Sequence, residues 1–191
     1  MNKQLIAAGL PICSALMSVP AQAATTPEQF NVRDFGGIGT GIADDQPAIN
    51  QAIQAVTKNK GGVLHFPYGT YRQSQSGPQD GIAFIGVSNV KVVFDPGAEL
   101  LMDNLNPVSG LGDWGHGILF RGPCHDVSVI NATIEWARKP NNRSHGDGIR
   151  FEGCLSDDKC ISNIKLLQCS TELSPQTGCI STPAGECTST A

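Results

Sequence analysis

Apolar and polar positions alternate along much of the chain, and the alternating segments recur at a fixed interval. The triplet at 88–90 returns at 125–127 and again at 162–164, 37 residues apart each time. Each triplet opens a run with apolar side chains at every second position: Val90, Val92 and Phe94, then Val127 and Val129, then Ile164 and Leu166. Period two is that of a β-strand, whose successive side chains point to opposite faces. These runs predict strands.

A second strand precedes each triplet and begins with a glycine, at 81–84, 117–120 and 148–151. A repeat of 20 to 50 residues indicates stacked units, none of which buries its apolar face alone. No helical periodicity separates the repeats. The pattern therefore predicts an all-β parallel β-helix. A meander of antiparallel hairpins is the alternative, and the constant register of the repeats favours the stacked coils.

Residues 31–71 form a different unit. A short strand is expected to begin at Asn31 and Val32, followed by a glycine-rich loop. Asp44 or Asp45 can cap a helix that tolerates Pro47 in its first turn. Its apolar face has helical spacing: Ala48, Ile49, Ala52, Ile53 and Val56. Gly61 and Gly62 end this helix, and residues 63–66 begin the first strand of the stack. Because only one face of this helix is apolar, we expect the helix to cover the open end of the stack.

Several separated motifs in this unit resemble those of one known family. They are the hexapeptide NVRDFG at 31–36, the DD pair at 44–45 followed by PAI at 47–49, the GGV at 61–63 and the FPYGTY at 66–71. In this order they resemble the pectate lyase superfamily, which includes rhamnogalacturonase-like and epimerase-like proteins. The resemblance implies a right-handed parallel β-helix with an N-terminal capping helix. It also implies an acidic, pectin-like polysaccharide as the partner.

The first 23 residues have the pattern of a secretory signal. Lys3 supplies the positive start, residues 5–19 the apolar segment and residues 21–23 a small-x-small cleavage site. We therefore expect a secreted or periplasmic protein. Without this segment the chain keeps 12 basic and 17 acidic side chains, a net charge of −5. An acidic chain without a basic cluster argues against nucleic acid or an anionic membrane as a partner.

Six cysteines remain after this cleavage, and an even number in an exported chain predicts disulfides. Cys154 and Cys160 flank a short segment and form the local pair that we expect. Pairing among Cys124, Cys169, Cys179 and Cys187 stays open. The cysteines and histidines do not have the spacing of a structural zinc site.

Glycoside hydrolysis needs paired carboxylates. In the polygalacturonase branch the first of them lies in an Asn-x-Asp-Gly motif, which residues 145–148 resemble through Asp147 but not through His145. The branch's second carboxylate pair is missing at the corresponding positions, 177–180. The Asp157–Asp158 pair lies in the inserted segment, and His116 lies in what we interpret as a coil corner. An inverting hydrolase is therefore disfavoured.

Elimination from a uronate needs a base near C5 and a positive group for the carboxylate. One polar connection, residues 139–144, is flanked by suitable side chains. The catalytic candidates are Asp147, His145, Glu135 and Arg150, and the substrate-binding candidates are Trp136, Arg138 and Arg143. Arg121 and Lys139 are further cations. Ca²⁺ is the cofactor to expect if the protein is a lyase, and no other cofactor is assigned.

Each candidate also has a plain structural explanation. Asp147 lies in Gly-Asp-Gly, which often forms a turn, and Trp136 can pack inside the coil. His145 can be a solvated turn residue. These alternatives stay open at the level of sequence.

The alternation stops after Ile180, so we expect one β-helix domain at 30–180 and an irregular tail at 181–191. A stack that ended there would have an open edge. A truncated chain is the favoured explanation; an altered reading frame, a covering partner or self-association are the others. The hypotheses are thus an exported enzyme that cleaves or modifies acidic polysaccharide, or a non-catalytic polysaccharide-binding or surface-structural β-helix, or an inactive fragment of a longer enzyme. Lyase, hydrolase and epimerase are not separated.

Overall fold

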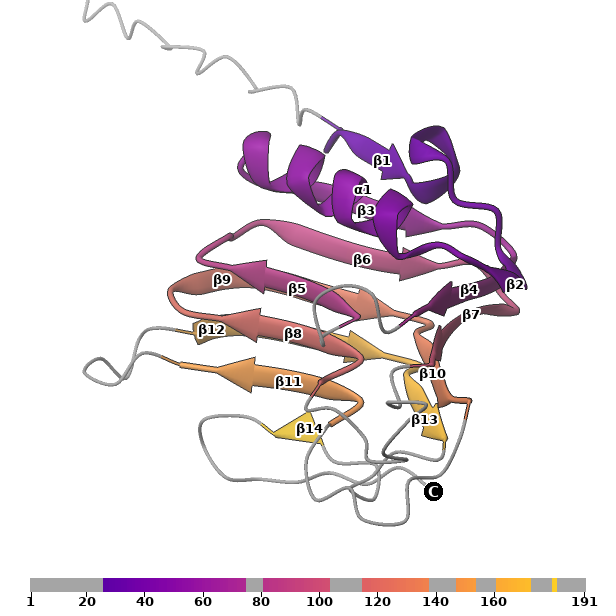
Figure 1. Cartoon of the computed structure of the whole chain (residues 1–191). Coiled ribbons are helices and arrows are strands. Elements are labelled where there is room, and N and C mark those ends of the chain that lie inside the picture. Colours follow the sequence, from indigo (N-terminus) through magenta and orange to yellow (C-terminus); the bar gives the residue numbers. More distant parts are fainter. Residues whose placement is uncertain are drawn as a thin grey trace, which may run out of the picture.

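The computed structural model describes residues 26–74, 81–103, 115–137, 147–153, 161–172 and 180–181. Within them the chain forms one α-helix, one short 3-10 helix and fourteen strands, which wind as successive coils of a parallel β-helix (Figure 1). Each complete coil passes once through each of three sheets, which we call A, B and C. This confirms the predicted fold class.

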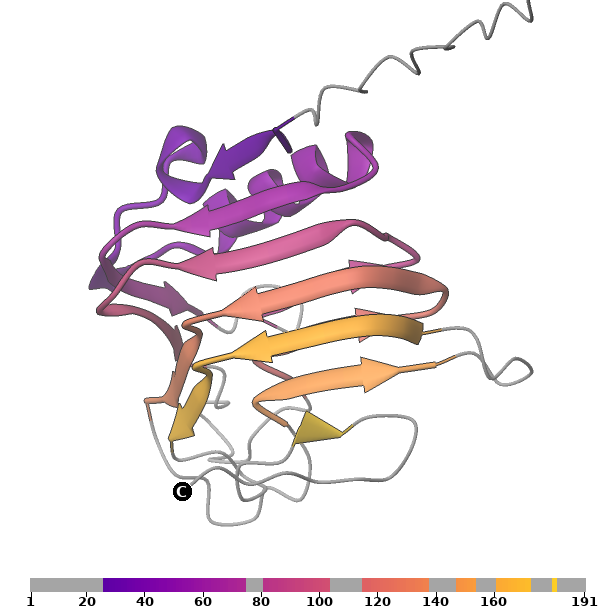
Figure 2. The ribbon, with the colours of Figure 1, turned by 180° about the vertical axis from the view of Figure 1, so that it is seen from behind.

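The strands of one sheet come from successive coils, and all strand pairs among the described residues are parallel. Sheet A contains β1 (Gln29–Asn31), β3 (Gly62–Phe66), β6 (Val90–Phe94), β9 (Cys124–Ile130) and β12 (Ile161–Leu167). Sheet B contains β2 (Thr40–Asp44), β4 (Gly69–Gln73), β7 (Ala98–Met102), β10 (Thr133–Trp136) and β13 (Ser170–Glu172). Sheet C contains β5 (Ile82–Ile85), β8 (Ile118–Arg121), β11 (Ile149–Glu152) and β14 (Ile180–Ser181). Figure 2 shows the strands of sheet A stacked one over the next.

The register of sheet A has the interval seen in the sequence. Ser128 pairs with Lys91 above it and with Lys165 below it. The corner residues Asn89, Asp126 and Asn163 share a left-handed conformation, with φ of 58°, 56° and 52°. Asn and Asp tolerate this conformation better than most side chains. The repeated triplets therefore mark a left-handed bend at the start of each of these sheet A strands.

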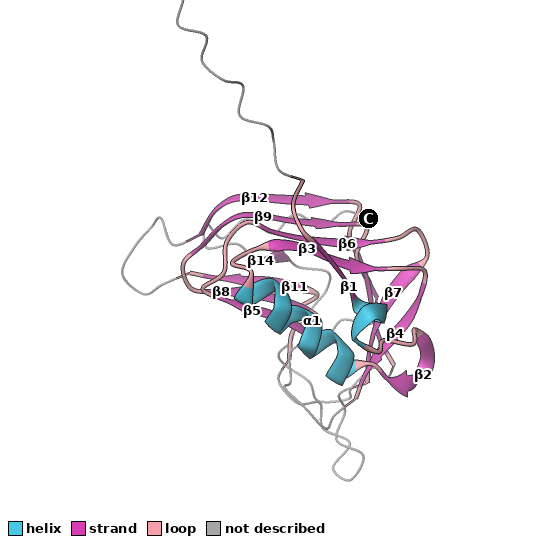
Figure 3. Ribbon diagram, turned by 90° about the horizontal axis from the view of Figure 1, so that it is seen from above, coloured by secondary structure: helices cyan, strands magenta, loops and turns pink. Residues whose placement is uncertain are grey.

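Helix α1 (Gln46–Lys58) lies across the N-terminal end of the coils (Figure 3). It buries Ala48, Ile49, Ala52, Ile53 and Val56, the face that the sequence predicted. The Asp44 carboxylate accepts a hydrogen bond from the Gln46 N–H, at 3.2 Å. Asp45 is buried instead and accepts from the N–H groups of Ile38 and Arg72, at 2.6 and 3.2 Å. The predicted cover over this end is confirmed.

The start of the domain differs from the prediction in two respects. Asn31 ends strand β1 rather than beginning a strand, and the next residues form the 3-10 helix η1 (Val32–Phe35). The Asn31 side chain accepts from the Arg33 N–H at 2.9 Å, a local bond that competes with strand pairing. In addition, β1 pairs with β3, so β3 is not the first strand of its sheet.

Aromatic side chains stack between coils inside the helix. Phe120 lies between Phe84 and Phe151, with ring centroids 5.4 and 5.3 Å away and nearly parallel planes. Phe66 and Phe94 stack at 4.4 Å in the same way. All five rings are buried. Equivalent positions of successive coils thus fill the interior with like side chains.

Two of the cysteines lie in the described residues, and both are free thiols. Burial raises the pKa of Cys124 and of Cys169, which makes them weak nucleophiles. Neither forms a disulfide, so the predicted pairing is not met at these two positions. Cys154, Cys160, Cys179 and Cys187 lie outside the described residues, as do the predicted signal segment and most of the tail. Across the described ranges, no helix has the length and apolar character needed to span a membrane.

The Phe120 stack provides a test of the fold. Phe120→Ala removes the central ring, and we expect it to lower the free energy of unfolding by about 3–5 kcal/mol. Urea denaturation followed by circular dichroism measures the change. Ile85→Ala, on the neighbouring strand of the same sheet but 62% exposed, is the control and should cost less than about 0.5 kcal/mol. Equal losses in the two variants would contradict the packing described here.

Candidate functional site

The candidate site lies on sheet C, where two glycines let neighbouring coils approach closely. A Cβ on Gly117 would lie 2.6 Å from the Gly148 carbonyl oxygen, and one on Gly81 equally close to that of Gly117. The hydrogen bonds between β8 and β11 therefore begin one residue before the strands do. The Gly117 N–H donates to the Asp147 carbonyl at 3.0 Å. This pairing brings His116 and Asp147, from successive coils, side by side.

A chain of polar contacts extends from these two residues across β8 and β11. We call its five members the sheet C network: His116, Arg121, Asp147, Arg150 and Glu152. Arg150 donates through Nη1 to Asp147 Oδ2 at 3.1 Å and through Nε to Glu152 Oε1 at 3.3 Å. Arg121 Nε donates to the other oxygen of Glu152 at 2.5 Å. Two arginines and two carboxylates thus alternate along one face of sheet C.

His116 has a defined tautomer in this arrangement. The backbone N–H of Asp147 donates to His116 Nδ1 at 3.0 Å, so Nδ1 carries a lone pair and the ring proton lies on Nε2. The same Nδ1 is 3.5 Å from Asp147 Oδ2, too far for a strong hydrogen bond. Since Nδ1 acts as the acceptor here, His116 offers Nε2–H as a donor.

Glu152 is held in its ionised form. The hydrogen bond from Arg121 lowers the pKa of its carboxyl group, and partial burial opposes this. The positive charges of Arg121 and Arg150 lower that pKa further. At neutral pH Glu152 is therefore a carboxylate held between two guanidinium groups.

The side chains of the sheet C network differ in how much of their surface is exposed to solvent. The Asp147 side chain is only 5% exposed, whereas those of Arg150 and Arg121 are 38% and 48% exposed. A polymer approaching sheet C would meet the guanidinium groups before the Asp147 carboxylate. Asp147 is suited to positioning Arg150 rather than to contacting a substrate itself.

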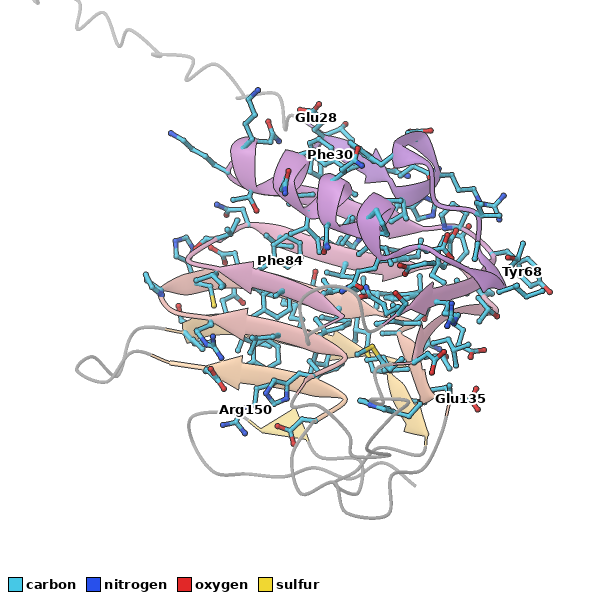
Figure 4. All side chains as sticks on the ribbon, viewed as in Figure 1. Glu28, Phe30, Tyr68, Phe84, Glu135 and Arg150 are labelled. Atoms are coloured by element: carbon cyan, nitrogen blue, oxygen red, sulfur yellow. The ribbon has the colours of Figure 1, made fainter. Side chains whose placement is uncertain are left out.

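The structure brings together two of the four predicted catalytic residues, Asp147 and Arg150. Glu135 projects from β10 in sheet B, and Figure 4 shows it on the other side of the coil from Arg150. His145, Arg138 and Arg143 lie outside the described residues.

Trp136 corrects a prediction. Its side chain belongs to the core and has no exposed surface, so its ring does not lie where a sugar could stack on it. The reason is strand parity: Trp136 lies two residues after the buried Ile134 and points to the same inner face.

Sequence reasoning missed the role of Glu152 and interpreted His116 only as a coil corner. A signal for Glu152 was present. The segments 117–122 and 148–153 read GILFRG and GIRFEG, and their alignment places Arg121 opposite Glu152. The structure has this register, with the two residues paired across β8 and β11.

The described residues do not suit a calcium ion. Among them no group of three His, Cys, Asp or Glu side chains is arranged to hold a metal. Both network carboxylates contact an arginine, whose positive charge would repel a cation.

The geometry agrees with comparisons to known proteins. The family model described as "Rhamnogalacturonase A/epimerase, pectate lyase-like" matches residues 29–183. The chain belongs to this family. The match covers all of the coils described above.

Several relatives are enzymes named for alginate or mannuronan. The chain is 48% identical over 56 residues, 29% of its length, to mannuronan C5-epimerase AlgE1 of Azotobacter vinelandii. It is 33% identical over 123 residues, 63% of its length, to alginate lyase 7 of the same organism. These alignments span 4% and 14% of the two relatives.

A solved structure supports the fold. The A-module of the Azotobacter vinelandii mannuronan C-5 epimerase AlgE6 superposes with a TM-score of 0.60 at 22% identity. The superposition covers 74% of this chain and 37% of the module.

Titration of Glu152 provides a test of the network. Because folding lowers the pKa of Glu152, its ionised carboxylate stabilises the folded protein at any pH above the pKa of the unfolded state. This contribution is lost as the pH falls through the lower pKa of the folded state. We expect Glu152→Gln to be less stable than the wild type at neutral pH and the difference to close in acid. Urea unfolding at a series of pH values measures it. A difference independent of pH would contradict the assignment.

Proposed function

We propose that this chain binds and modifies an acidic polysaccharide built of uronate units, with alginate as the substrate class and the sheet C network as part of the binding face. Family membership and the alginate-modifying relatives support a uronate polymer. The relatives' names favour alginate over the pectin-like polymer that the sequence motifs implied. The predicted export would bring the protein to such polymers.

The observation that carries the proposal is the pair of partly exposed arginines on adjacent coils. Arg121 and Arg150 lie on neighbouring strands, and both already contact a carboxylate of the protein. A guanidinium group matches the planar geometry of a carboxylate and remains charged at all relevant pH values. Two such groups on one face suit a polymer that carries a carboxylate on every sugar.

The same groups assist chemistry at C5 of a uronate. Neutralising the carboxylate makes the C5 proton more acidic, because negative charge develops beside it as that proton leaves. In elimination, the C5–H electron pair forms the C4–C5 double bond, the C4–O bond breaks and the leaving oxygen takes a proton. In epimerisation, C5 takes a proton from the opposite face instead. Both reactions share the first step, which accounts for lyases and epimerases among the relatives.

We assign the roles as follows. Arg150 and Arg121 bind uronate carboxylates, and Asp147 positions Arg150 through its 3.1 Å contact. His116 offers a hydrogen-bond donor from Nε2 beside them. His145, two residues ahead of Asp147, remains our candidate for the proton-transfer group, because imidazole has a pKa close to neutral pH.

The proposal is tested with the 191-residue protein on polymannuronate, polyguluronate and polygalacturonate. Unsaturated products, detected by ultraviolet absorbance, would identify a lyase. A changed uronate ratio, with solvent deuterium at C5 by NMR, would identify an epimerase. Binding without either product would support the non-catalytic alternative. Absence of binding to all three polymers would overturn the proposal.

Removing one arginine should weaken polymer binding. We expect Arg150→Gln to raise the Kd for polymannuronate by about tenfold, as charge-assisted hydrogen bonds contribute about 1.5–3 kcal/mol. Lys91→Gln, an exposed cation on β6 in sheet A, is the charge-matched control and should change the Kd by less than about twofold. Calorimetry at fixed ionic strength measures both. An equal effect of the two variants would show that net charge alone directs binding.

A further inference from the structure

Glu152 contacts two arginines, whereas an ordinary surface ion pair joins one carboxylate to one cation. Its two carboxylate oxygens are engaged separately, Oε2 by Arg121 Nε and Oε1 by Arg150 Nε. Arg121 reaches it from the preceding coil, where it is the direct cross-strand partner of Glu152. Arg150 reaches it from the same strand, two residues earlier.

Arg150 divides its contacts between two carboxylates through different nitrogens. Nη1 donates to Asp147, whose side chain is buried, and Nε donates to Glu152, whose side chain is 26% exposed. Displacing Glu152 would therefore leave the contact with Asp147 intact. The guanidinium group would keep its place while its Nε–H donated to another carboxylate.

We propose that Glu152 stands in for a uronate carboxylate: it occupies the Arg121–Arg150 position in the free protein, and the polymer binds there by displacing it. This inference rests on the proposed function. It names the group with which the substrate exchanges and gives Glu152 a role in specificity rather than in catalysis.

The exchange is favourable for a polymer because the pairs it replaces are partly exposed. Such ion pairs contribute little net stability, since each charge is also well solvated when apart. A uronate polymer forms several such contacts at once, and the later contacts form at high effective concentration. A neutral polysaccharide has no group that could replace the Glu152 carboxylate, so Glu152 also selects against uncharged polymers.

The experiment compares polymannuronate binding by wild type and by Glu152→Gln, which keeps the shape of the side chain but removes its charge. We expect Glu152→Gln to bind about three- to tenfold more tightly, since the polymer no longer displaces an ionised competitor. Glu28→Gln is the matched control, because it removes the same charge at the opposite end of the coils from β11 (Figure 4) and should leave the Kd unchanged within about twofold. Circular dichroism establishes that each variant is folded.

A second comparison tests whether the gain depends on Arg121. In the Glu152→Gln background, adding Arg121→Gln should return the Kd to the wild-type value or above it, because the gain depends on the Arg121 guanidinium group. Persistence of the tighter binding in the double variant would overturn the inference.

The outcomes distinguish the inference from the proposed function. If wild type binds and Glu152→Gln binds equally or more weakly, Glu152 orients the arginines for the polymer and the inference is wrong, while the proposed function stands. If neither protein binds any uronate polymer, the proposed function fails and the inference fails with it.

Discussion

In-register parallel pairing between coils is the constraint on which the rest of this structure depends. Each strand donates and accepts its backbone hydrogen bonds through the coil before and the coil after it, so no coil is stable alone. Pairing in register places equivalent side chains over one another. Inside the helix this produces the stack of Phe84, Phe120 and Phe151, whose rings lie 5.4 and 5.3 Å apart. The ladder and the aromatic stack support each other, because a slip by one residue would turn every inner side chain outward.

The same constraint builds the candidate site on the outer face. Residues far apart in sequence become neighbours when they share a position in the repeat, as Arg121 and Glu152 do. Gly117 permits the close approach that sets His116 against Asp147, because no larger residue fits beside the Gly148 carbonyl. Charges of opposite sign therefore alternate across coils, on and beside the paired strands β8 and β11. A rigid scaffold of this kind fixes the spacing of carboxylate-binding groups, which lowers the entropic cost of binding a repetitive polymer.

The sequence predicted the strands, the repeat and the helix more completely than it predicted which side chains contact one another. Strand period, coil interval and the helical face at 48–56 are local patterns, and each was present in the structure. The register continues to the last described strand, where Ile149 pairs with Ile180. Side-chain contacts depend on which coils meet and on strand parity. Glu135 and Trp136 are adjacent in sequence, yet parity sends Trp136 into the core and leaves Glu135 outside. Asn31 shows the other limit, because one side-chain hydrogen bond converted an expected strand into a 3-10 turn.

The central claim is that arginines of sheet C receive the carboxylates of a uronate polymer. The most direct measurement is NMR of the arginine Nε–H signals during titration with polymannuronate. We expect the signals of Arg121 and Arg150 to shift together as the polymer binds. Those of Arg33 and Arg72, which contact Tyr71 and Asp103 elsewhere on the coils, should stay in place. Shifts confined to Arg33 or Arg72, or binding that leaves Arg121 and Arg150 unchanged, would contradict the central claim.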